Sequence, residues 1–447
     1  MNENYAAKHS ENAIDLYELR LSWLNDTEIH ANAFESVEER LSIHLHHITN
    51  APDIDPASAK EPSTEAECFL FLACHLNSQK PQKNSAGYAL AYQWLALDPA
   101  KAAAAEAALS LYPEADTSQL LKLYDEQASL RPSLMRLFRK QMQNLPQALL
   151  QGAKSDEASS TELKIEALHY AAAHPDIGLE LFRSHYVPLL SGNSQFDANL
   201  IATALWGGLV RGDAEAHTAL TAALSHTSNA QDLPPLLRLA ALSGSPDFLP
   251  LLLQAAESDP DSGYPLLVLY GQKSVIPELL KALAIAHTIE HAAAAFEQLT
   301  DHSLPRIPRL TVVGEETDPD EAAPEDIPDI KAAHTWWQQN QPNWKTGERW
   351  LSGQATTPAH LTHLTKKHAG QFGCDLMALL ALSQKTPLNI PSEIWRAKQQ
   401  QLLAAHPAAS SQFPVPSCQL FAVAFCLGCV SRFLFPPYST RPSFKSL

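Results

Sequence analysis

The chain is poor in the residues that build sheets and disulfide-linked frameworks. Only 16 glycines and six cysteines occur among its 447 residues, and β-branched residues are sparse beside alanine and leucine. Apolar and polar residues do not alternate convincingly over more than about five positions, as a half-buried strand would require. Six cysteines are too few to hold a chain of this length together by disulfides. We therefore expect an all-α protein, whose length suggests about two or three domains.

Positive charge and long apolar runs are also scarce. The formal net charge is −17 and the densest basic pair is Lys366-Lys367, so the chain lacks the basic surface that nucleic-acid binding requires. Met1 to Leu24 carries charges throughout and has no apolar run typical of a signal peptide. The apolar run from Leu420 to Val430 spans 11 residues, too short to cross a bilayer. We expect no nucleic-acid partner, no membrane span and a cytoplasmic location.

The common signatures of catalytic sites are missing. The sequence has no G-x-S-x-G elbow, no P-loop and no dinucleotide-binding fingerprint. A nucleophile, base and acid cannot be grouped from the sequence either. An enzyme is therefore the weaker class of protein, and we expect no cofactor.

One short motif keeps a catalytic alternative open. His287-Thr-Ile-Glu290-His291 has the H-x-x-E-H spacing of inverted zinc proteases, in which two histidines one helical turn apart bind the metal and the glutamate is the general base. A metal-dependent hydrolase is the alternative function that this motif suggests. The competing interpretation is a packing helix, which the segment from Ala292 to Leu299 would continue.

Two other groups of metal-ligating residue types have ordinary explanations. His44, His46 and His47 lie on one predicted helix without an acidic or cysteine partner at ligand spacing, which indicates surface histidines. Cys426-x-x-Cys429 has no second pair of the kind that a structural zinc site usually needs, which indicates buried cysteines. We therefore expect no metal site from these residues.

The most regular feature is a repeat in the centre of the chain. Leu242–Leu253 matches Leu269–Leu280 at a constant offset of 27 residues without a gap. Weaker copies run from Leu205 to Leu220 and from Leu168 to Leu181. A period near this length indicates stacked helix pairs, and therefore an α-solenoid, an architecture that usually binds other proteins.

In each of the two matching copies, a glycine, a polar residue and a proline mark the boundary between two helices. The glycine can adopt a positive φ and end one helix, and the polar residue after it is expected to cap the next. The proline suits the first turn of that next helix, where its missing N–H costs little. The pairs are Gly244 and Gly271, Asp247 and Ser274, and Pro250 and Pro277. In a weaker copy Gly212 and Asp213 stand at the same turn.

Composition and capping patterns organise the rest of the chain. Ser36-x-x-Glu39 and Thr64-x-x-Glu67 have the capping-box pattern that opens a helix. We expect five regions: an N-terminal helical region at 1–155, a helical repeat array at 156–304, an acidic linker or loop at 305–330, a C-terminal helical region at 331–406, and a proline-rich tail with a short apolar segment at 407–447.

An acidic segment and a tryptophan cluster supply the partner-binding candidates. Residues 311–330 hold eight acidic and no basic residues, as a solvated connector or an acidic docking segment would. Half of the eight tryptophans follow within 15 residues, as the core of a helical region or as a binding surface. The candidates for contact with a partner are Trp344, Trp350, Glu315, Glu316 and Asp318.

Three motifs resemble those of an uncharacterised family of HEAT-like repeat proteins encoded beside type VI secretion genes in proteobacteria. Glu39-Arg40-x-x-x-His44-Leu45 resembles its E-R-x-x-x-H-L element, and Ala294 to Thr300 resembles its A-x-A-F-x-x-I-T-G element. Trp336-Trp337 followed by Gly347-x-Arg349-x-Leu351-x-Gly353 resembles its W-W…G-x-R-Y-L-x-G block. The chain departs from this pattern at Asp301, where glycine is expected, and after His406. Phycobilin-lyase-type HEAT repeats are a weaker match.

This resemblance implies an association with type VI secretion and no catalytic residue. Together with the repeat, it leads us to expect a non-catalytic scaffold or adaptor with protein partners, namely components or effectors of the secretion machine, bound on the concave face of a HEAT-like array. An immunity protein that sequesters a toxin is an alternative of the same class. The alternative of a different class is the hydrolase that would use His287, Glu290 and His291.

Overall fold

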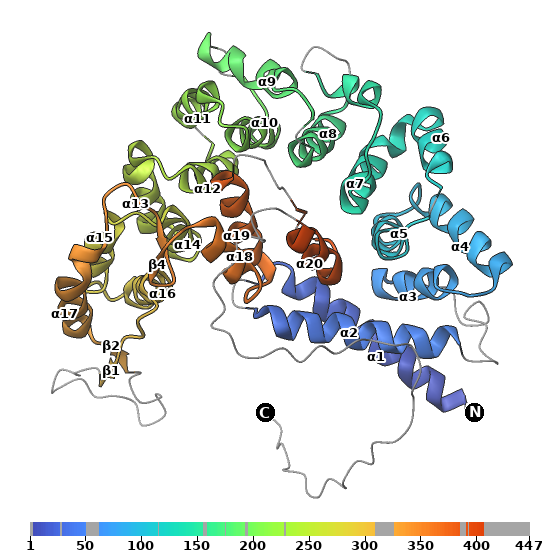
Figure 1. Cartoon of the computed structure of the whole chain (residues 1–447), viewed down its shortest axis with the longest axis horizontal. Helices are drawn as coiled ribbons and strands as arrows, with labels where there is room; N and C mark the ends of the chain where they lie inside the picture. The colour runs from blue at the N-terminus through green and yellow to red at the C-terminus, as the bar shows by residue number, and fades with distance from the viewer. Residues whose placement is uncertain are drawn as a thin grey trace, which may run out of the picture. The chain divides into compact units, whose positions relative to one another are not determined.

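The computed structural model of this chain is all-α, as the composition predicts (Figure 1). It describes residues 3–405, apart from 27–28, 51–61, 115, 155–158, 175, 193–194, 228, 309–325, 385–389 and 392. Met1–Ser410 forms one compact unit. None of the helices in the described ranges is long and apolar enough to span a membrane. The predicted tail at 407–447, with Cys426 and Cys429, lies outside the described residues.

In the N-terminal region, a local signal starts α3 and a long-range contact starts α2. Thr64 caps α3, and its capping box with Glu67 is confirmed. The box expected at Ser36 is wrong, because α2 already begins at Ala31, where the Ala31 N–H bonds to the carbonyl of Lys367 at 2.8 Å. The helices are α1 (Glu3–Trp23), α2 (Ala31–Thr49), α3 (Glu65–Leu76), α4 (Pro81–Trp94), α5 (Pro99–Leu111), α6 (Ser118–Glu126) and α7 (Arg131–Gln141), with short 3₁₀ turns η2 (Ala128–Leu130) and η3 (Gln147–Ala153).

The central region is built from alternating helices. Each of α8, α10, α12, α14 and α16 contacts the next member of this series, and we call them the inner row. Figure 1 shows α9, α11, α13 and α15 along the outer side of the inner row. The bounds are α8 (Thr161–Ala173), α9 (Glu180–Leu190), α10 (Ala198–Val210), α11 (Ala214–His226), η4 (Ala230–Asp232), α12 (Leu233–Ser243), η5 (Pro246–Phe248), α13 (Leu249–Ser258), α14 (Pro260–Tyr270), α15 (Val275–Ala282) and α16 (Ile289–Thr300).

The C-terminal region packs against the inner row. α19 contacts α10 and α12, and its apolar residues belong to the same core cluster as theirs. The C-terminal region therefore covers part of the inner row. The elements are β1 (Arg306–Ile307) paired antiparallel with β2 (Ile327–Pro328), α17 (Ile330–Asn340), η6 (Gln341–Asn343), the hairpin β3 (Trp350–Leu351) and β4 (Gln354–Ala355), α18 (Pro358–Thr365), α19 (Gly370–Ser383) and α20 (Arg396–Ala405).

The repeat glycines end their helices as predicted. Gly244 and Gly271 follow α12 and α14 with φ of +65° and +61°, and Gly212 has φ of +69°. The expected caps at Asp247 and Ser274 are wrong. Ser245 instead caps the 3₁₀ turn η5, so α13 starts only at Leu249. Ser274 has helical backbone angles and makes no capping hydrogen bond.

The ends of the two repeat helices are joined by one arginine. Arg349 Nη2 donates to the carbonyls of Ala241 (3.2 Å) and Leu242 (2.6 Å) at the end of α12, and Nε donates to the carbonyl of Tyr270 (3.2 Å) at the end of α14. A helix carries partial negative charge at its C-terminus, which favours a cation there. Burial lowers the pKa of Arg349 to about 10, which leaves it charged at pH 7. The repeat glycines thus sit where the C-terminal region docks.

In the repeat copy that contains Gly212, the carboxylate of Asp213 caps the start of α11. Asp213 accepts hydrogen bonds from the backbone N–H of Glu215 in α11 and from the Tyr186 hydroxyl. Arg183 of α9 binds the same carboxylate through Nε (2.9 Å) and Nη2 (2.8 Å). The hydrogen bonds from Arg183 outweigh the effect of burial and lower the pKa of Asp213 to about 2.

Replacing Asp213 with asparagine is expected to destabilise the protein at pH 7 by about 2 kcal/mol, because charge-assisted hydrogen bonds are lost. The folded pKa lies below that of an unfolded aspartate, about 3.9. The ionised carboxylate therefore stabilises the fold above that value, and this contribution is lost as the pH falls toward about 2. Urea unfolding of both proteins from pH 7 to pH 2.5 measures this. A difference that does not shrink below pH 4 would contradict it, and Asp247→Asn, at an exposed aspartate, is the control.

Candidate functional site

The last described helix returns to the start of the chain. We call Glu393–Gln399 the C-terminal latch. The carbonyl of Glu393 accepts a hydrogen bond from Arg20 Nη2 of α1 at 3.1 Å, across 373 positions of sequence. Glu38 of α2 accepts from the backbone N–H of Arg396 at 2.7 Å. Arg20 and Glu38 are themselves paired at 2.7 Å. The latch thus joins the two ends of the described chain.

Trp395 is the central side chain of the latch. It is 7% exposed and stacks on Phe69 of α3 with a centroid distance of 5.8 Å. Its Nε1 donates to Ser110 Oγ of α5 at 3.3 Å, and the Arg20 guanidinium lies 4.1 Å from the ring. One indole therefore contacts α1, α3 and α5.

Arg396 supplies the polar half of the latch. Its side chain is 3% exposed, and Nε binds Glu35 Oε1 of α2 at 3.1 Å. Nη1 donates to Gln399 at 3.0 Å, and Nη2 donates to the carbonyl of Thr365. A buried arginine is stable only when its donors are satisfied, and each nitrogen here has an acceptor.

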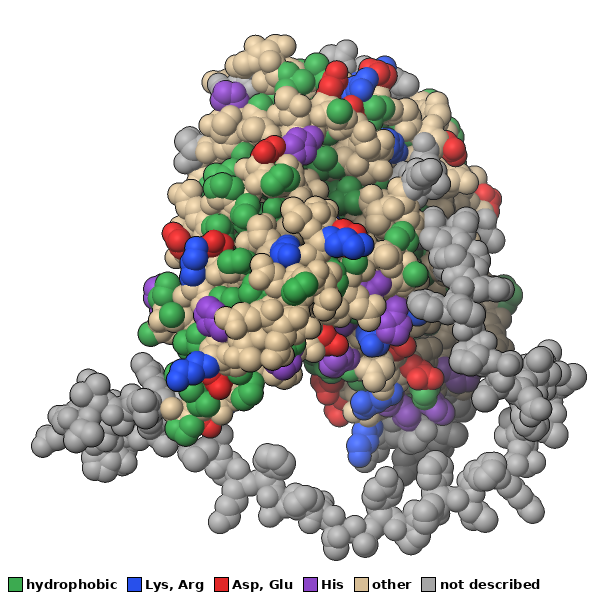
Figure 2. Space-filling model, turned by 60° about the vertical axis from the view of Figure 1, so that its left-hand side comes forward, with side chains coloured by type: hydrophobic (Ala, Val, Ile, Leu, Met, Phe, Trp, Pro, Cys, Tyr) green, Lys and Arg blue, Asp and Glu red, His purple; other side chains and the backbone are tan. Residues whose placement is uncertain are grey.

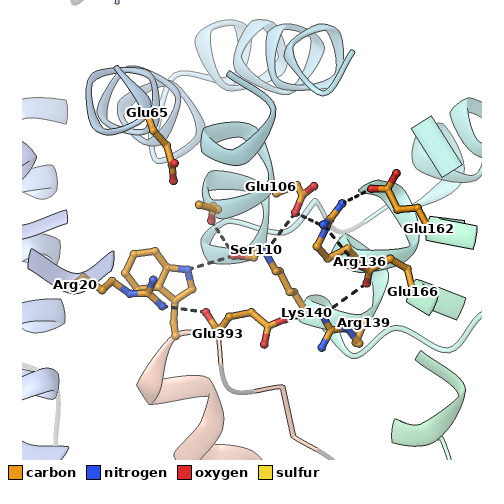
Figure 3. Close-up of polar contacts among 12 residues, drawn as sticks. Arg20, Glu65, Glu106, Ser110, Arg136, Arg139, Lys140, Glu162, Glu166 and Glu393 are labelled. Atoms are coloured by element: carbon orange, nitrogen blue, oxygen red, sulfur yellow. Dashed lines mark hydrogen bonds and ion pairs between the residues drawn. The ribbon is translucent and has the colours of Figure 1, made fainter. Parts of the chain in front are cut away.

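A charged network adjoins the latch (Figure 3). Arg139 Nη2 binds Glu393 Oε1 at 2.6 Å and lies 3.7 Å from Glu166. Burial opposes the ionisation of Glu393, but the charges of Arg139 and Lys140 outweigh it and lower its pKa to about 2. Arg136 and Lys140 carry the network on to Glu106, at 3.2 and 3.3 Å. The network therefore connects the latch with α5, α7 and α8.

An open cavity lies beside this network and is the candidate functional site. Its volume is about 480 Å³, and its walls come from α7, α8, α10, α12, α19 and the latch segment. The apolar lining includes Trp206 and Met377. The polar and charged lining residues are Arg139, His169, Asn199, Thr203, Arg238 and Glu393. The inner row thus keeps a cavity that α19 does not fill.

The polar groups of the cavity are suited to hydrogen bonding. Burial lowers the pKa of His169 to about 4, and the charge of Arg139 acts in the same direction, so the imidazole is neutral at pH 7. Among the described residues, neither His169 ring nitrogen has a hydrogen-bond partner, and Arg139 Nε is buried without one. Arg238 is already paired with Asp375 at 2.5 Å. Because unpaired buried polar groups are costly, the cavity favours a ligand that hydrogen-bonds.

The H-x-x-E-H motif does not have the geometry that it needs. α16 begins at Ile289, so His287 lies in the preceding turn and is not one helical turn below His291 on the same helix. Glu290 is paired with Arg306 at 2.6 Å, and His291 lies 3.7 Å from Asp261. The packing-helix interpretation describes the segment from Ala292 to Leu299 correctly. Within the described ranges, no three His, Cys, Asp or Glu side chains are placed to hold a metal ion.

The other histidine group lies mainly at the surface. His46 and His47 are exposed and His44 is half-buried. His44 Nδ1 lies 2.7 Å from Nδ1 of His9 on α1, a contact that the sequence pattern did not suggest. Burial, followed by the charge of His9, lowers the pKa of His44.

The tryptophan cluster is mostly core. Trp344 is 3% exposed and stacks on Trp350 at 4.5 Å, and Trp337 meets it edge to face. Trp344 therefore has almost no surface for a partner, and we assign it to the core. Trp350 is half-buried. The remaining partner-binding candidates, Glu315, Glu316 and Asp318, lie outside the described residues.

Sequence reasoning missed the latch and the cavity. Glu393-x-Trp395-Arg396 carried one usable signal, a tryptophan beside charged residues in an otherwise polar segment, but a single sequence does not reveal a contact across more than 350 positions. A scan against protein-family models gave no match for the chain, and searches of curated proteins and of solved structures also gave none.

Proposed function

We propose that this protein is a non-catalytic adaptor that binds another protein, and that the cavity beside the latch accepts an anchoring side chain of the partner. The single observation that carries this proposal is the open cavity of about 480 Å³ with unpaired hydrogen-bonding groups. Binding energy at protein interfaces is concentrated in a few large side chains seated in such pockets.

The architecture that we propose for the adaptor is a solenoid of HEAT-like helix pairs. The alternating helices α8 to α16 and the glycine-terminated copies at Gly212, Gly244 and Gly271 support it. Large exposed apolar residues such as Leu251, Ile285 and Ile307 lie on separate elements. Figure 2 likewise shows hydrophobic, charged and other side chains interspersed on one face. A recessed anchor therefore suits this surface better than a broad apolar contact does.

The partner class follows from the resemblance noted in the sequence. We propose a component or an effector of type VI secretion in the cytoplasm, with no nucleic acid involved. The net charge of −17 favours a partner with a basic contact surface.

Binding of purified secretion components and effectors by calorimetry tests the proposal. Ala378 is half-buried on α19 and lines the cavity, so Ala378→Phe is expected to fill it and weaken binding by tenfold or more. Ala214→Phe, at an exposed position of α11, is the matched control and should bind normally. The proposal fails if no component binds, or if Ala378→Phe folds and binds as the wild type does.

A further inference from the structure

A second cavity lies at the end of α12, where the C-terminal region docks. Its volume is about 390 Å³, and Ser243, Gly244, Gln272 and Arg349 are among its lining residues. Leu242 lines both this cavity and the one beside the latch, but Arg139, His169 and Arg238 line only the latter and Gly244, Gln272 and Arg349 only the former. A ligand here would therefore meet a different set of polar side chains from the proposed partner anchor.

Among the described residues, no acidic side chain compensates the positive charge in this cavity. None of the described residues that line it is acidic, and Arg349 forms no ion pair with any described residue. The partners of its guanidinium are three main-chain carbonyls, which carry only partial negative charge. Removing an arginine from water without an anionic partner is costly, and a bound anion would relieve that cost.

Hydrogen-bond donors remain available beside that charge. Nη1 of Arg349 makes no hydrogen bond with any described residue, and this nitrogen is not fully buried. His217 also lines the cavity, and its ring nitrogens have no hydrogen-bond partner among the described residues. An arginine nitrogen and an imidazole are both suited to a carboxylate oxygen.

The rest of the lining is mainly leucine, with Thr356 and Ser383 as further polar side chains. Leu209, Leu361, Leu379 and Leu382 contribute to the walls. Leucine walls next to one cation favour a ligand with a short hydrocarbon part and a single negative charge over a compact dianion such as phosphate.

We propose that this cavity binds a carboxylate with a short apolar body, whose carboxylate contacts Arg349 and His217. Two sources share this chemistry: a free carboxylic acid and the C-terminal carboxylate of a protein ending in an apolar residue. Both are short enough for the cavity, and the experiment below distinguishes them.

Calorimetry with the full chain compares each acid with its uncharged amide. The probes are hexanoate with hexanamide for a free acid, and N-acetyl-leucine with N-acetyl-leucinamide for a protein C-terminus. At least one acid is expected to bind about tenfold or more tightly than its amide, as a charge-assisted hydrogen bond provides. The tighter acid identifies the source. Equal binding of acid and amide in both pairs, or no binding of either acid at millimolar concentration, would overturn the proposal.

Two variants locate the site. His217→Leu keeps a similar side-chain size at a half-buried position and is expected to weaken acid binding several-fold without unfolding the protein. Arg349→Lys keeps the charge but not the planar donor group, and should weaken it about tenfold. Arg349→Lys can also loosen the fold, so His217→Leu is the deciding variant. If the folded His217→Leu protein binds the acid as the wild type does, the site is wrong. Ala378→Phe should bind the acid normally, which separates this result from the adaptor proposal.

Discussion

Truncation of Trp395 to alanine is expected to lower the free energy of unfolding by about 3–5 kcal/mol, the range for a large buried aromatic side chain. The indole is 7% exposed, and it joins α1, α3 and α5 through a cation–π contact, a stacked ring and a hydrogen bond. All three contacts are lost together in the alanine variant. Urea unfolding measures the change, and limited proteolysis is expected to cut near the latch earlier than in the wild type.

Two milder substitutions separate the contributions of this side chain. Ser110→Ala removes the acceptor of Nε1 and should cost about 0.5–1.5 kcal/mol, the net value of one hydrogen bond. Trp395→Phe keeps an aromatic ring over Phe69. Its cost in free energy of unfolding should lie between those of Ser110→Ala and Trp395→Ala. If Trp395→Ala costs no more than Ser110→Ala, then the indole does not anchor the latch.

Replacing Gly271 with alanine is expected to cost about 2–4 kcal/mol. A positive φ of +61° disfavours any residue with a Cβ, by about 1 kcal/mol. In addition, a Cβ at this position would lie 2.7 Å from the carbonyl oxygen of Trp350 and 2.8 Å from Cγ of Arg349. Since the first of these is backbone, the docked C-terminal region would have to move. Thermal or urea unfolding provides the measurement.

Gly212 is the matched control for this substitution. It has a similar φ of +69°, but a Cβ there would meet nothing within 4 Å. Gly212→Ala should therefore cost only the conformational term of about 1 kcal/mol. Equal costs at Gly212 and Gly271 would show that the contact with Arg349 and Trp350 adds nothing to stability.

Local signals predicted much of the fold. The glycine stops at Gly244 and Gly271 and the capping box at Thr64 depend on residues within one turn of each other, and all are found in the structure. The predicted box at Ser36 failed because a distant backbone contact starts α2 earlier: Ala31 bonds to Lys367, and Ala369 bonds to Ile29. A local pattern competes poorly with hydrogen bonds to another part of the chain.

The candidate site could not be predicted from the sequence, because it too depends on contacts between distant parts of the chain. The first cavity is formed by α7, α8, α10, α12, α19 and the latch, which are separated by long stretches of chain. His169 and Arg139 have no distinctive local spacing, and their environment comes from packing. The H-x-x-E-H motif is the reverse case: its spacing in the sequence suggests a site, but its first histidine precedes the helix, so the geometry of the site is absent.

The latch contacts can form only late in the synthesis of the chain. Arg20 is translated 373 positions before Glu393, to whose carbonyl it donates. At about 5–20 residues per second, roughly 20–75 seconds separate their synthesis. Helix α1 is therefore complete well before the latch that packs on it has been synthesised. The apolar surface around Phe69 that Trp395 covers stays open during that interval, and such transiently exposed surface makes a folding chain prone to aggregation.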